Sequence, residues 1–411
     1  MNKLNILFIN HYSITPSKGG ASRHYEIGKR LSKNGHDITL IGGCYHHHLK
    51  KNISFTSPFE ISYEDGLKVI WLRLKKYSNP QGVWRFINWL TFAIRILLLN
   101  KENYKKPDVI YYSSLSLVGV IAAYLLSKIH RAKFIFEVRD IWPLSIQELK
   151  GISKHNPAVI FLRLIEKFGY KKADLIVSTI PGLTKHLVNS GIKDKQSFHS
   201  PNGIENTEYP NIFSPVFEKI KKKQSSKFVV GYAGSIGTPN GVETLVEAAN
   251  ALKEEKGIFF TIVGDGPCKK DLIDLSKKYK LNNIFFADRV PRQEVHQIIE
   301  SFDVAFHGQS IITPLYDFGI SPNKMADYML HGKPVVNAYS GGEDPVKKFN
   351  CGITVPALDH KGVANSIMQF NNMEKEIFLK MSTNAKQAIN FFYDYDVISS
   401  HLEYQLLGLF K

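Results

Sequence analysis

Short apolar runs alternate with longer stretches of helical period along all 411 residues of this chain. Because this alternation is typical of βα units, it predicts parallel sheets covered by helices. The expected strands form a first series at Leu4–Asn10, Asp37–Ile41, Val109–Tyr112, Lys133–Val138 and Leu175–Ser178, and a second at Phe228–Ala233, Phe259–Val263, Ile284–Phe286, Val304–Phe306 and Pro334–Asn337.

The stretch between the two series, Pro201–Lys227, is rich in Pro and Asn and has no clear period. We interpret it as the crossing between domains, which is consistent with roughly 150 residues per domain. The expected domains are 1–200 and 201–390. The aromatic, helical end of the chain, 391–411, is expected to return and pack on the first domain.

Composition narrows the class of protein. With 44% hydrophobic and 22% charged residues, disorder, collagen-like sequence and coiled coil are excluded as the main architecture. The formal charge of +16 indicates attraction to nucleic acid, an anionic bilayer or a phosphorylated substrate. Because zinc-finger spacings and RNA-binding aromatic signatures are absent from the sequence, nucleic acid is not expected as a partner.

The cysteine and histidine patterns indicate whether the chain binds a metal and in which cellular compartment it is expected. Cys44, Cys268 and Cys351 are too few and too far apart for a disulfide framework or a Cys-based zinc site. His46–His48 is interpreted as a solvated loop, since consecutive histidines point in different directions. We therefore expect a cytoplasmic protein without metal or cofactor.

Glycines near helix starts mark candidate phosphate loops. Gly19-Gly20 precedes a helix expected over Ala21–Lys33, and Gly234-Ser235 follows the strand Phe228–Ala233. Glycine lets backbone amides approach an anion at a helix start. For the first pair a flexible surface turn is an equal alternative. The turn Val263–Pro267 is interpreted as an ordinary βα turn.

A more specific segment lies between Gly319 and Pro334. Ser321 is the expected N-cap, Pro322 the first helical residue and Gly332 the stop. This places Asn323 and Lys324 at a helix start suited to a phosphate, with Asp327 one turn on to accept hydrogen bonds from sugar hydroxyls. The alternative is a capped helix with an ion pair between Lys324 and Asp327.

Arg139-Asp140 follows the strand Lys133–Val138 directly. A charged pair at the carboxyl end of a parallel strand suits a catalytic or substrate-orienting site, while a structural salt bridge is the alternative.

The stretch Trp84–Leu99 combines a broad apolar helical face with Trp84, Trp89, Arg85 and Arg95, and lysines flank it. Such a helix is typical of one that lies in a bilayer interface, and it is too short and too charged to span the membrane. The alternative is a helix that covers the sheet, with Arg85, Asn88 and Arg95 on its solvent-exposed edge.

Six segments in order carry a resemblance to a known family: KGGASRHYEIGKRLSKNGHDITL, VRDIWP, SPNGIE at 200–205, VGYAGSIGTPNGVETLVEAANAL, FTIVGDGP and GISPNKMADYMLHGKPVV. Together they resemble the retaining glycosyltransferases of family 4, and within it the L-fucosamine transferase-like subgroup of bacterial O-antigen and capsule biosynthesis. The resemblance implies the GT-B fold, an α/β architecture of two facing Rossmann-like domains with parallel sheets and a cleft between them.

The resemblance also implies roles for single residues. Gly20 matches the glycine loop that faces the donor diphosphate, and Ser321, Asn323 and Lys324 match the phosphate-binding helix start. Asp327 matches the acidic residue that holds the ribose, Val290 lies where the base-contacting loop is found, and Arg139 stands where many relatives place a catalytic-site His.

Two departures from the family pattern concern charge. Many relatives place an Arg and a Lys on the diphosphate from the segment that here reads Gly234-Ser235 to Asn240-Gly241. Both basic positions are lost, which leaves the charge to Lys324, helped by Arg292 or Arg139. In the Glu-x7-Glu motif Asp327 fills the second place, but Gly319 stands at the first and Asp317 is only nearby.

The function expected from this resemblance is retaining transfer of an N-acetylated hexosamine or deoxyhexosamine. The donor is a UDP-sugar and the acceptor a membrane-held, polyprenyl-diphosphate-linked saccharide. The enzyme is expected to be peripheral on the inner face of the cytoplasmic membrane. The alternatives are a UDP-sugar epimerase of the same architecture and a noncatalytic membrane-associated scaffold.

Overall fold

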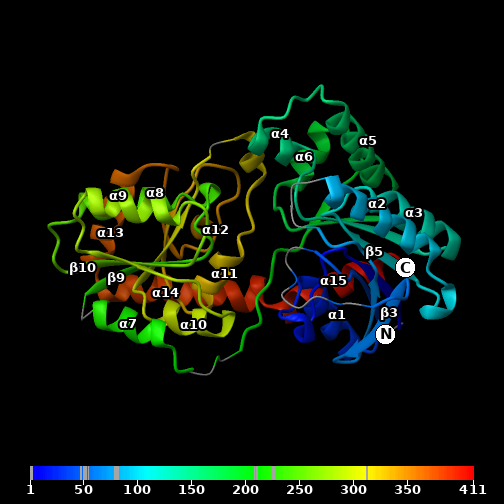
Figure 1. The fold of residues 1–411 in the computed structure, drawn as a ribbon, viewed down its shortest axis with the longest axis horizontal. Helices are drawn as coiled ribbons and strands as arrows, with labels where there is room; N and C mark the ends of the chain where they lie inside the picture. The colour runs from blue at the N-terminus through cyan, green and yellow to red at the C-terminus, as the bar shows by residue number, and fades with distance from the viewer. Residues whose placement is uncertain are drawn as a thin grey trace. The chain divides into compact units, whose positions relative to one another are not determined.

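A computed structural model describes residues 3–46, 49, 53, 55–77, 83–207, 209, 212–224, 227–311 and 313–411. The chain divides into two compact units. The N-terminal unit comprises residues 1–202 and 395–411, and the C-terminal unit comprises residues 203–394. Each unit contains one sheet with helices packed on it (Figure 1).

The sheet of the N-terminal unit has the strand order β3-β4-β2-β1-β5-β6-β7-β8. Its strands are β1 Asn5–Ile9, β2 Asp37–Gly43, β3 Phe59–Glu64, β4 Leu67–Leu72, β5 Val109–Ser113, β6 Lys133–Val138, β7 Leu175–Ser178 and β8 Ser197–His199. All pairs are parallel except β3 with β4. The central strands are almost wholly buried, as expected for a parallel sheet covered on both faces.

The helices of this unit are α1 Arg23–Lys33, α2 Val83–Leu98, α3 Gly119–His130, α4 Leu144–Lys150, α5 Pro157–Lys172, α6 Leu183–Asn189 and α15 Tyr395–Gly408. Helix α15 packs against α1, so the end of the chain belongs to the N-terminal unit. The carboxylate of Glu403 on α15 contacts His36 Nε2 at 2.9 Å and accepts from Asn34 Nδ2 at 2.6 Å.

The C-terminal unit has a six-stranded parallel sheet in the order β11-β10-β9-β12-β13-β14. The strands are β9 Phe228–Ala233, β10 Ile258–Val263, β11 Ile284–Ala287, β12 Val304–Gly308, β13 Val335–Ala338 and β14 Gly352–Val355. The chain runs outward from β9 through β10 and β11 and then returns to β12 on the other side of β9. The carboxyl ends of β9 and β12 therefore form the switch point where open α/β sheets bind ligands.

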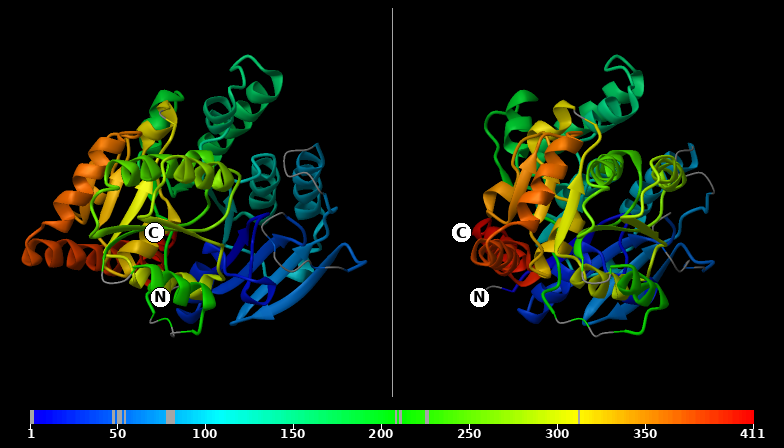
Figure 2. Two further views of the ribbon diagram at one scale, coloured as in Figure 1. Left: turned by 60° about the vertical axis from the view of Figure 1, so that its left-hand side comes forward. Right: turned by 90° about the vertical axis from the view of Figure 1, so that its left-hand side faces the viewer.

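Helices cover both faces of this second sheet, and each face has its own apolar core (Figure 2). They are α7 Pro215–Gln224, α8 Val242–Ala251, α9 Lys269–Lys278, α10 Arg292–Glu300, α11 Asn323–Leu330, α12 Pro345–Lys348, α13 His360–Asn371 and α14 Lys375–Ala388, which continues into a π-helix at Ile389–Tyr393. Short 3-10 turns lie at Pro16–Lys18, Lys101–Asn103, Thr238–Asn240 and Pro314–Phe318.

Each of the ten predicted strands overlaps an observed one, but four observed strands were not predicted. Strands β3, β4, β8 and β14 lie at or next to a sheet edge. Strands β8 and β14 are short and only half-buried, so their sequences lack a continuous apolar run. The presumed crossing also contains helix α7, in which Phe217 and Ile220 are buried among lysines and give only a weak apolar period.

Candidate active site

The start of α11 lies next to the carboxyl end of β9 in the C-terminal unit. The helix begins at Asn323, so Pro322 and not Ser321 holds the N-cap position, and Ser321 lies one residue outside. A proline ring cannot accept a hydrogen bond, so the N-cap residue itself does not cap the helix. The first turn of α11 therefore keeps the positive end of its dipole uncompensated by a capping group.

Lys324 is the cation of this helix start. Its Nζ donates to Tyr232 Oη at 3.0 Å and to Asn240 Oδ1 at 2.5 Å, and it lies 4.8 Å from the centre of the Tyr232 ring. In the part of the chain that the structure describes, no carboxylate forms an ion pair with it. Burial lowers the pKa of Lys324 to about 8. The site thus holds a desolvated cation without a counter-ion, which favours an anionic ligand.

Gly234 lies where the loop after β9 passes the lysine. A Cβ at this position would lie 3.4 Å from Lys324 Cε and 3.2 Å from Tyr232 Oη. Ser235 is exposed, and its carbonyl oxygen accepts from Tyr232 Oη at 2.5 Å. Gly234 and Ser235 therefore lie close to Lys324 at the start of α11.

Gly264 and Gly266 follow β10 and have a packing role. A Cβ at Gly264 would lie 1.8 Å from the carbonyl oxygen of Gly234, and one at Gly266 would lie 2.3 Å from that of Ile236. These glycines let two loops approach each other backbone to backbone, which supports their interpretation as a structural turn.

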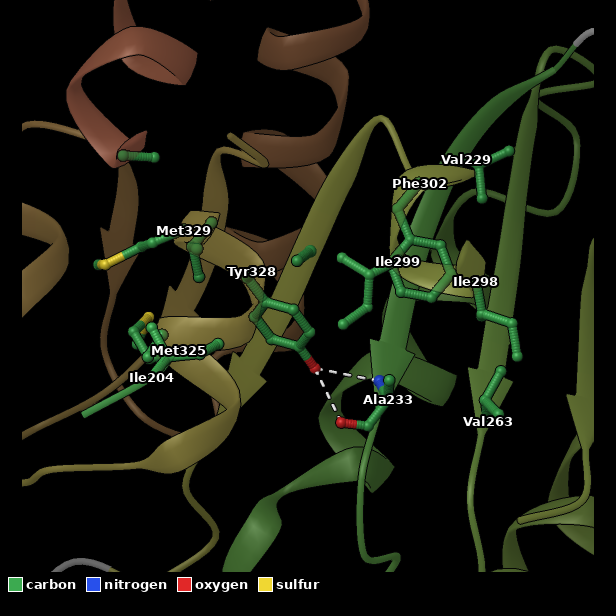
Figure 3. Packing of buried hydrophobic residues seen from close by; sticks show 14 of the residues in the cluster. Ile204, Val229, Ala233, Val263, Ile298, Ile299, Phe302, Met325, Tyr328 and Met329 are labelled. Carbon is green, nitrogen blue, oxygen red and sulfur yellow. Dashed lines mark hydrogen bonds between the residues drawn. The ribbon is translucent and has the colours of Figure 1, made fainter. Parts of the chain in front are cut away.

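Tyr328 fixes the position of α11 against β9. Its hydroxyl accepts from the amide of Ala233 at 3.0 Å and donates to the carbonyl of the same residue at 3.2 Å. Figure 3 shows both bonds, with Met325 and Met329 beside Tyr328 in the apolar core. This role could not be predicted from the sequence, because a buried tyrosine on a helix is ordinary core composition.

Asp327 is buried, with 5% of its surface exposed, and is paired with Arg292 at the start of α10. Arg292 Nη1 donates to Asp327 Oδ2 at 2.7 Å, and Nη2 donates to Oδ1. Burial raises the pKa of Asp327, while the guanidinium opposes that rise. The alternative ion pair between Lys324 and Asp327 is thus wrong. Val290 is buried two residues before Arg292.

In the N-terminal unit, Gly19 and Gly20 lie in an exposed loop between β1 and α1. Gly19 has a φ of 100°, which favours glycine, and closes a turn on the carbonyl of Pro16. The loop is held at its base by Glu64, which accepts from Thr15 Oγ1 at 2.8 Å. Contacts within the protein therefore hold the base of this loop.

Arg139 and Asp140 follow β6 as predicted, but they do not pair with each other. Asp140 accepts from Trp142 Nε1 at 3.0 Å and from Ser145 Oγ, so it organises the turn into α4. Only backbone atoms of Arg139 are hydrogen-bonded among the described residues. The half-buried guanidinium remains available at the carboxyl edge of the sheet.

A buried charge network directly precedes Arg139 and was not predicted. Glu137 is fully buried and accepts from Arg23 Nε at 2.9 Å and Tyr111 Oη at 2.8 Å, and contacts His24 Nε2 at 2.6 Å. Burial alone would raise the pKa of Glu137, but His24 and Arg23 hold that pKa well below its usual range. A single glutamate inside an apolar strand gave no pattern from which these contacts could be inferred.

The helix predicted at Trp84–Leu99 is α2, and its inward face differs from the prediction. Asn88 and Trp89 are buried: Asn88 bonds the backbone of Lys75, and Trp89 Nε1 donates to Tyr12 Oη at 2.9 Å. Trp89 is thus not an interfacial side chain, whereas Trp84 is 47% exposed. Arg85 and Arg95 are half-buried, and Arg95 donates to the carbonyl of Pro58 at 2.8 Å.

The histidine cluster also differs from the prediction. His46 is buried, with Nε2 3.1 Å from the carbonyl oxygen of Ser13, and is not solvated. His47 and His48 lie outside the described residues. Within the described ranges, no group of three His, Cys, Asp or Glu side chains is arranged to hold a metal ion, and the three cysteines are free thiols. None of the described helices is both long enough and apolar enough to cross a bilayer.

Comparison with known proteins assigns the class to which this fold and site belong. Residues 18–208 match the family described as glycosyltransferase family 4, and residues 227–372 match the glycosyl transferases group 1. The sucrose-phosphate synthase of Thermosynechococcus elongatus superposes with a TM-score of 0.74 at 15% identity over 99% of both chains. HepE of Anabaena, solved with UDP and glucose, superposes with a TM-score of 0.66 at 16% identity over 98% of this chain and 100% of its own. The predicted fold class, two Rossmann-like domains of the GT-B type, is confirmed.

The two matches together span most of the chain and support its assignment as a glycosyltransferase. Among curated relatives, WcaI of Escherichia coli K12, named for colanic acid biosynthesis, is 22% identical over 64% of this chain and 66% of its own length. CapM of Staphylococcus aureus, named for capsular polysaccharide biosynthesis, is 22% identical over 73% of this chain and 78% of its own. WbjE of Pseudomonas aeruginosa is matched over 52% of its length, so the chain spans about half to three quarters of these relatives.

Proposed function

We propose that the protein transfers a sugar from a UDP-sugar to a membrane-held, polyprenyl-diphosphate-linked saccharide during synthesis of a bacterial surface polysaccharide. The observation that carries this proposal is the uncompensated Lys324 ammonium at the start of α11, next to the switch point of the C-terminal sheet. The UDP bound to HepE supports the choice of nucleotide. The names of WcaI and CapM support the polysaccharide pathway.

The proposed mechanism depends on where negative charge develops during sugar transfer. When the bond between the sugar and the β-phosphate breaks, negative charge grows on the departing phosphate oxygen. Free amides at the start of α11 and the Lys324 ammonium are already positioned for such an anion, so they stabilise the transition state without reorganisation. The positive charge that relatives take from two basic residues comes here from Lys324, which Asn240 holds in place.

Retention follows if the acceptor approaches on the side from which the diphosphate leaves. In that front-face mechanism the departing phosphate oxygen takes the proton of the acceptor hydroxyl, the new glycosidic bond forms on the same face, and UDP leaves protonated. No pair of carboxylates of the glycosidase type is needed. An N-acetylated hexosamine or deoxyhexosamine is the sugar we propose.

The acceptor is assigned to the N-terminal unit. Arg139 offers a half-buried guanidinium at the carboxyl edge of that sheet, where it can bind the diphosphate of a polyprenyl carrier. The same proposal places the enzyme at the cytoplasmic face of the membrane, where such carriers are accessible.

The decisive experiment is mass spectrometry of the purified chain incubated with a panel of UDP-sugars and a short polyprenyl-diphosphate saccharide. We expect one UDP-N-acetylhexosamine or its deoxy derivative to extend the acceptor, with the anomeric configuration retained in the product by NMR. Conversion of the UDP-sugar without acceptor would instead identify an epimerase. Lack of saturable UDP binding in calorimetry would overturn both activities.

A further inference from the structure

Three neighbouring helices of the N-terminal unit expose large apolar side chains. Helix α3 lies between α2 and α5 and contacts both (Figure 1). The exposed fraction is 56% for Ile94 on α2, 53% for Ile129 on α3 and 63% for Leu164 on α5. We call the outer surface of these helices the α2/α3/α5 face.

The exposure has helical periodicity and is not confined to helix ends. On α3, Ile121, Leu125 and Ile129 are four residues apart and all exposed, while Ala122 and Leu126 next to them are buried. On α5, Leu164 is exposed between the buried Leu162 and Ile165. Each helix thus has one apolar face toward the sheet and a second apolar stripe away from it. A monomeric soluble protein rarely exposes apolar side chains over several adjacent elements, so this face is an interaction surface.

The charges on the three helices are almost all positive. Helix α2 carries Arg85 and Arg95 and no acid, and α3 carries Lys128 and no acid. Helix α5 carries four cations and one acid, Glu166, which is buried and bonded to Tyr170. A partner of the α2/α3/α5 face must therefore accept apolar side chains and offer negative charge around them.

A second copy of the chain does not meet that requirement. In a twofold symmetric dimer the same patch would face itself, so the cations would oppose cations with no exposed acid on these helices to pair with them. An anionic bilayer meets the requirement, because its acyl region accepts apolar side chains and its headgroups attract Lys and Arg.

We propose that the α2/α3/α5 face of the N-terminal unit binds the surface of an anionic bilayer, with the apolar stripes of all three helices in the interface and the basic side chains among the headgroups. The inference rests on the proposed function only in that both place the acceptor at a membrane. It assigns the contact to three helices and not to α2 alone.

The test is flotation of the full chain with vesicles of phosphatidylglycerol and phosphatidylcholine, compared with phosphatidylcholine alone. A triple variant with Ile94→Gln, Ile129→Gln and Leu164→Gln changes one exposed side chain on each helix. We expect its partition into anionic vesicles to fall at least about tenfold. The matched control is Ile377→Gln, Leu379→Gln and Phe391→Gln, three exposed apolar side chains of the C-terminal unit, which should partition like wild type.

A variant with fewer positive charges tests whether the basic side chains of the α2/α3/α5 face bind the anionic headgroups. Lys128 and Lys172 are exposed on α3 and α5, and both lie within 6 Å of the Tyr124 ring (5.2 and 5.9 Å). Replacing both by Gln should lower partition into anionic vesicles about fivefold per charge and leave binding to phosphatidylcholine unchanged. The control replaces Lys221 and Lys223, exposed on α7, in the same way.

A spectroscopic measurement keeps the test independent of folding defects. Trp84 is the one exposed tryptophan of the four, all of which are described. We expect the wild-type emission to shift to the blue when anionic vesicles are added, and Trp84→Phe to abolish that shift. Wild-type protein that does not float, or a triple variant that floats like wild type, overturns the proposal. Concentration-dependent dimers that the triple variant loses would also overturn it, and would identify a subunit interface.

Activity on a water-soluble acceptor analogue separates this inference from the proposed function. If the triple variant keeps that activity and loses vesicle binding, both proposals are supported. If wild-type protein is active but does not bind vesicles, only the α2/α3/α5 face is wrong. If it binds vesicles but transfers no sugar, the proposed function fails and the bilayer contact stands.

Discussion

Lys324 combines desolvation with the lack of a neighbouring carboxylate among the described residues, and these two properties make its role testable. If the ammonium stabilises the departing diphosphate, Lys324→Ala should lower turnover about 100- to 1000-fold, which corresponds to the loss of about 2.7–4 kcal/mol from one preorganised donor. Steady-state kinetics with donor and acceptor measure this effect. Lys278→Ala, an exposed lysine of α9, is the control and should leave turnover unchanged. An unchanged rate in Lys324→Ala would remove this residue from the mechanism.

The lowered pKa of Lys324 gives a second prediction, for the pH dependence of UDP binding. Burial lowers this pKa from 10.5 to about 8, so above pH 8 most free protein holds a neutral amine. A diphosphate favours the charged form and raises the pKa again, so binding must take up protons in the window between these two values. The affinity for UDP should therefore fall as pH rises through 8.

Calorimetry just above pH 8 in two buffers of different ionisation enthalpy measures this proton uptake. Lys324→Arg keeps the charge at these pH values, so it should bind UDP without the uptake. Equal uptake by wild type and by Lys324→Arg would assign the proton to another group.

At the scale of elements, α11 is held against β9 by Tyr328. The change Tyr328→Phe leaves the amide and carbonyl of Ala233 without the hydroxyl that satisfies them. We expect the free energy of unfolding in urea to fall by about 1–3 kcal/mol, the cost of a buried unsatisfied polar group. Tyr279→Phe removes only a surface bond to Glu247 and should change stability by less than about 0.5 kcal/mol. Equal losses in the two variants would argue against the anchoring role.

Helix α2 is linked to the carboxyl edge of the N-terminal sheet through Trp89. Its ring lies edge-on to Trp142 at 5.6 Å, and its Nε1 donates to Tyr12 Oη. Because Tyr12 and Trp142 belong to the loops after β1 and β6, Trp89→Phe should raise the KM for the acceptor. UDP affinity should not change, since Lys324 and its partners lie in the other unit. Kinetics with varied acceptor, together with UDP calorimetry, test this, with the exposed Trp84→Phe and a soluble acceptor as control.

Some helices and strands could be predicted from the sequence, whereas contacts between distant segments could not. Strands buried on both faces, such as β6 and β9, are continuous apolar runs and were predicted with their observed bounds. Local signals placed Lys324 in the first turn of a helix, because such signals depend on residues close in sequence, although the N-cap is Pro322 and not Ser321. The partners of Lys324, Asp327 and Glu137 come from segments far along the chain, and no local pattern specifies which of several charged residues will meet. Spacing alone therefore offered an ion pair between Lys324 and Asp327 as the alternative to a ligand site, whereas Asp327 pairs with Arg292.

At the scale of the whole molecule, the chain carries a formal charge of +16, and the α2/α3/α5 face joins cations to exposed apolar side chains on three adjacent helices. The electrostatic attraction of the cations and the burial of the apolar side chains respond differently to salt. Added salt shortens the Debye length from about 10 Å at 0.1 M to about 3 Å at 1 M and so screens the charges. Apolar burial is not weakened by salt.

Flotation at increasing NaCl therefore separates a charged protein that is merely attracted to lipid from one that inserts side chains. Wild type should lose most of its preference for anionic vesicles near 1 M salt, yet retain a fraction on the vesicles through the apolar stripes. The triple variant at Ile94, Ile129 and Leu164 should bind at low salt through its remaining cations and be released completely at high salt. If wild type is released completely as well, net charge alone accounts for the attraction, and the exposed stripes do not enter the bilayer.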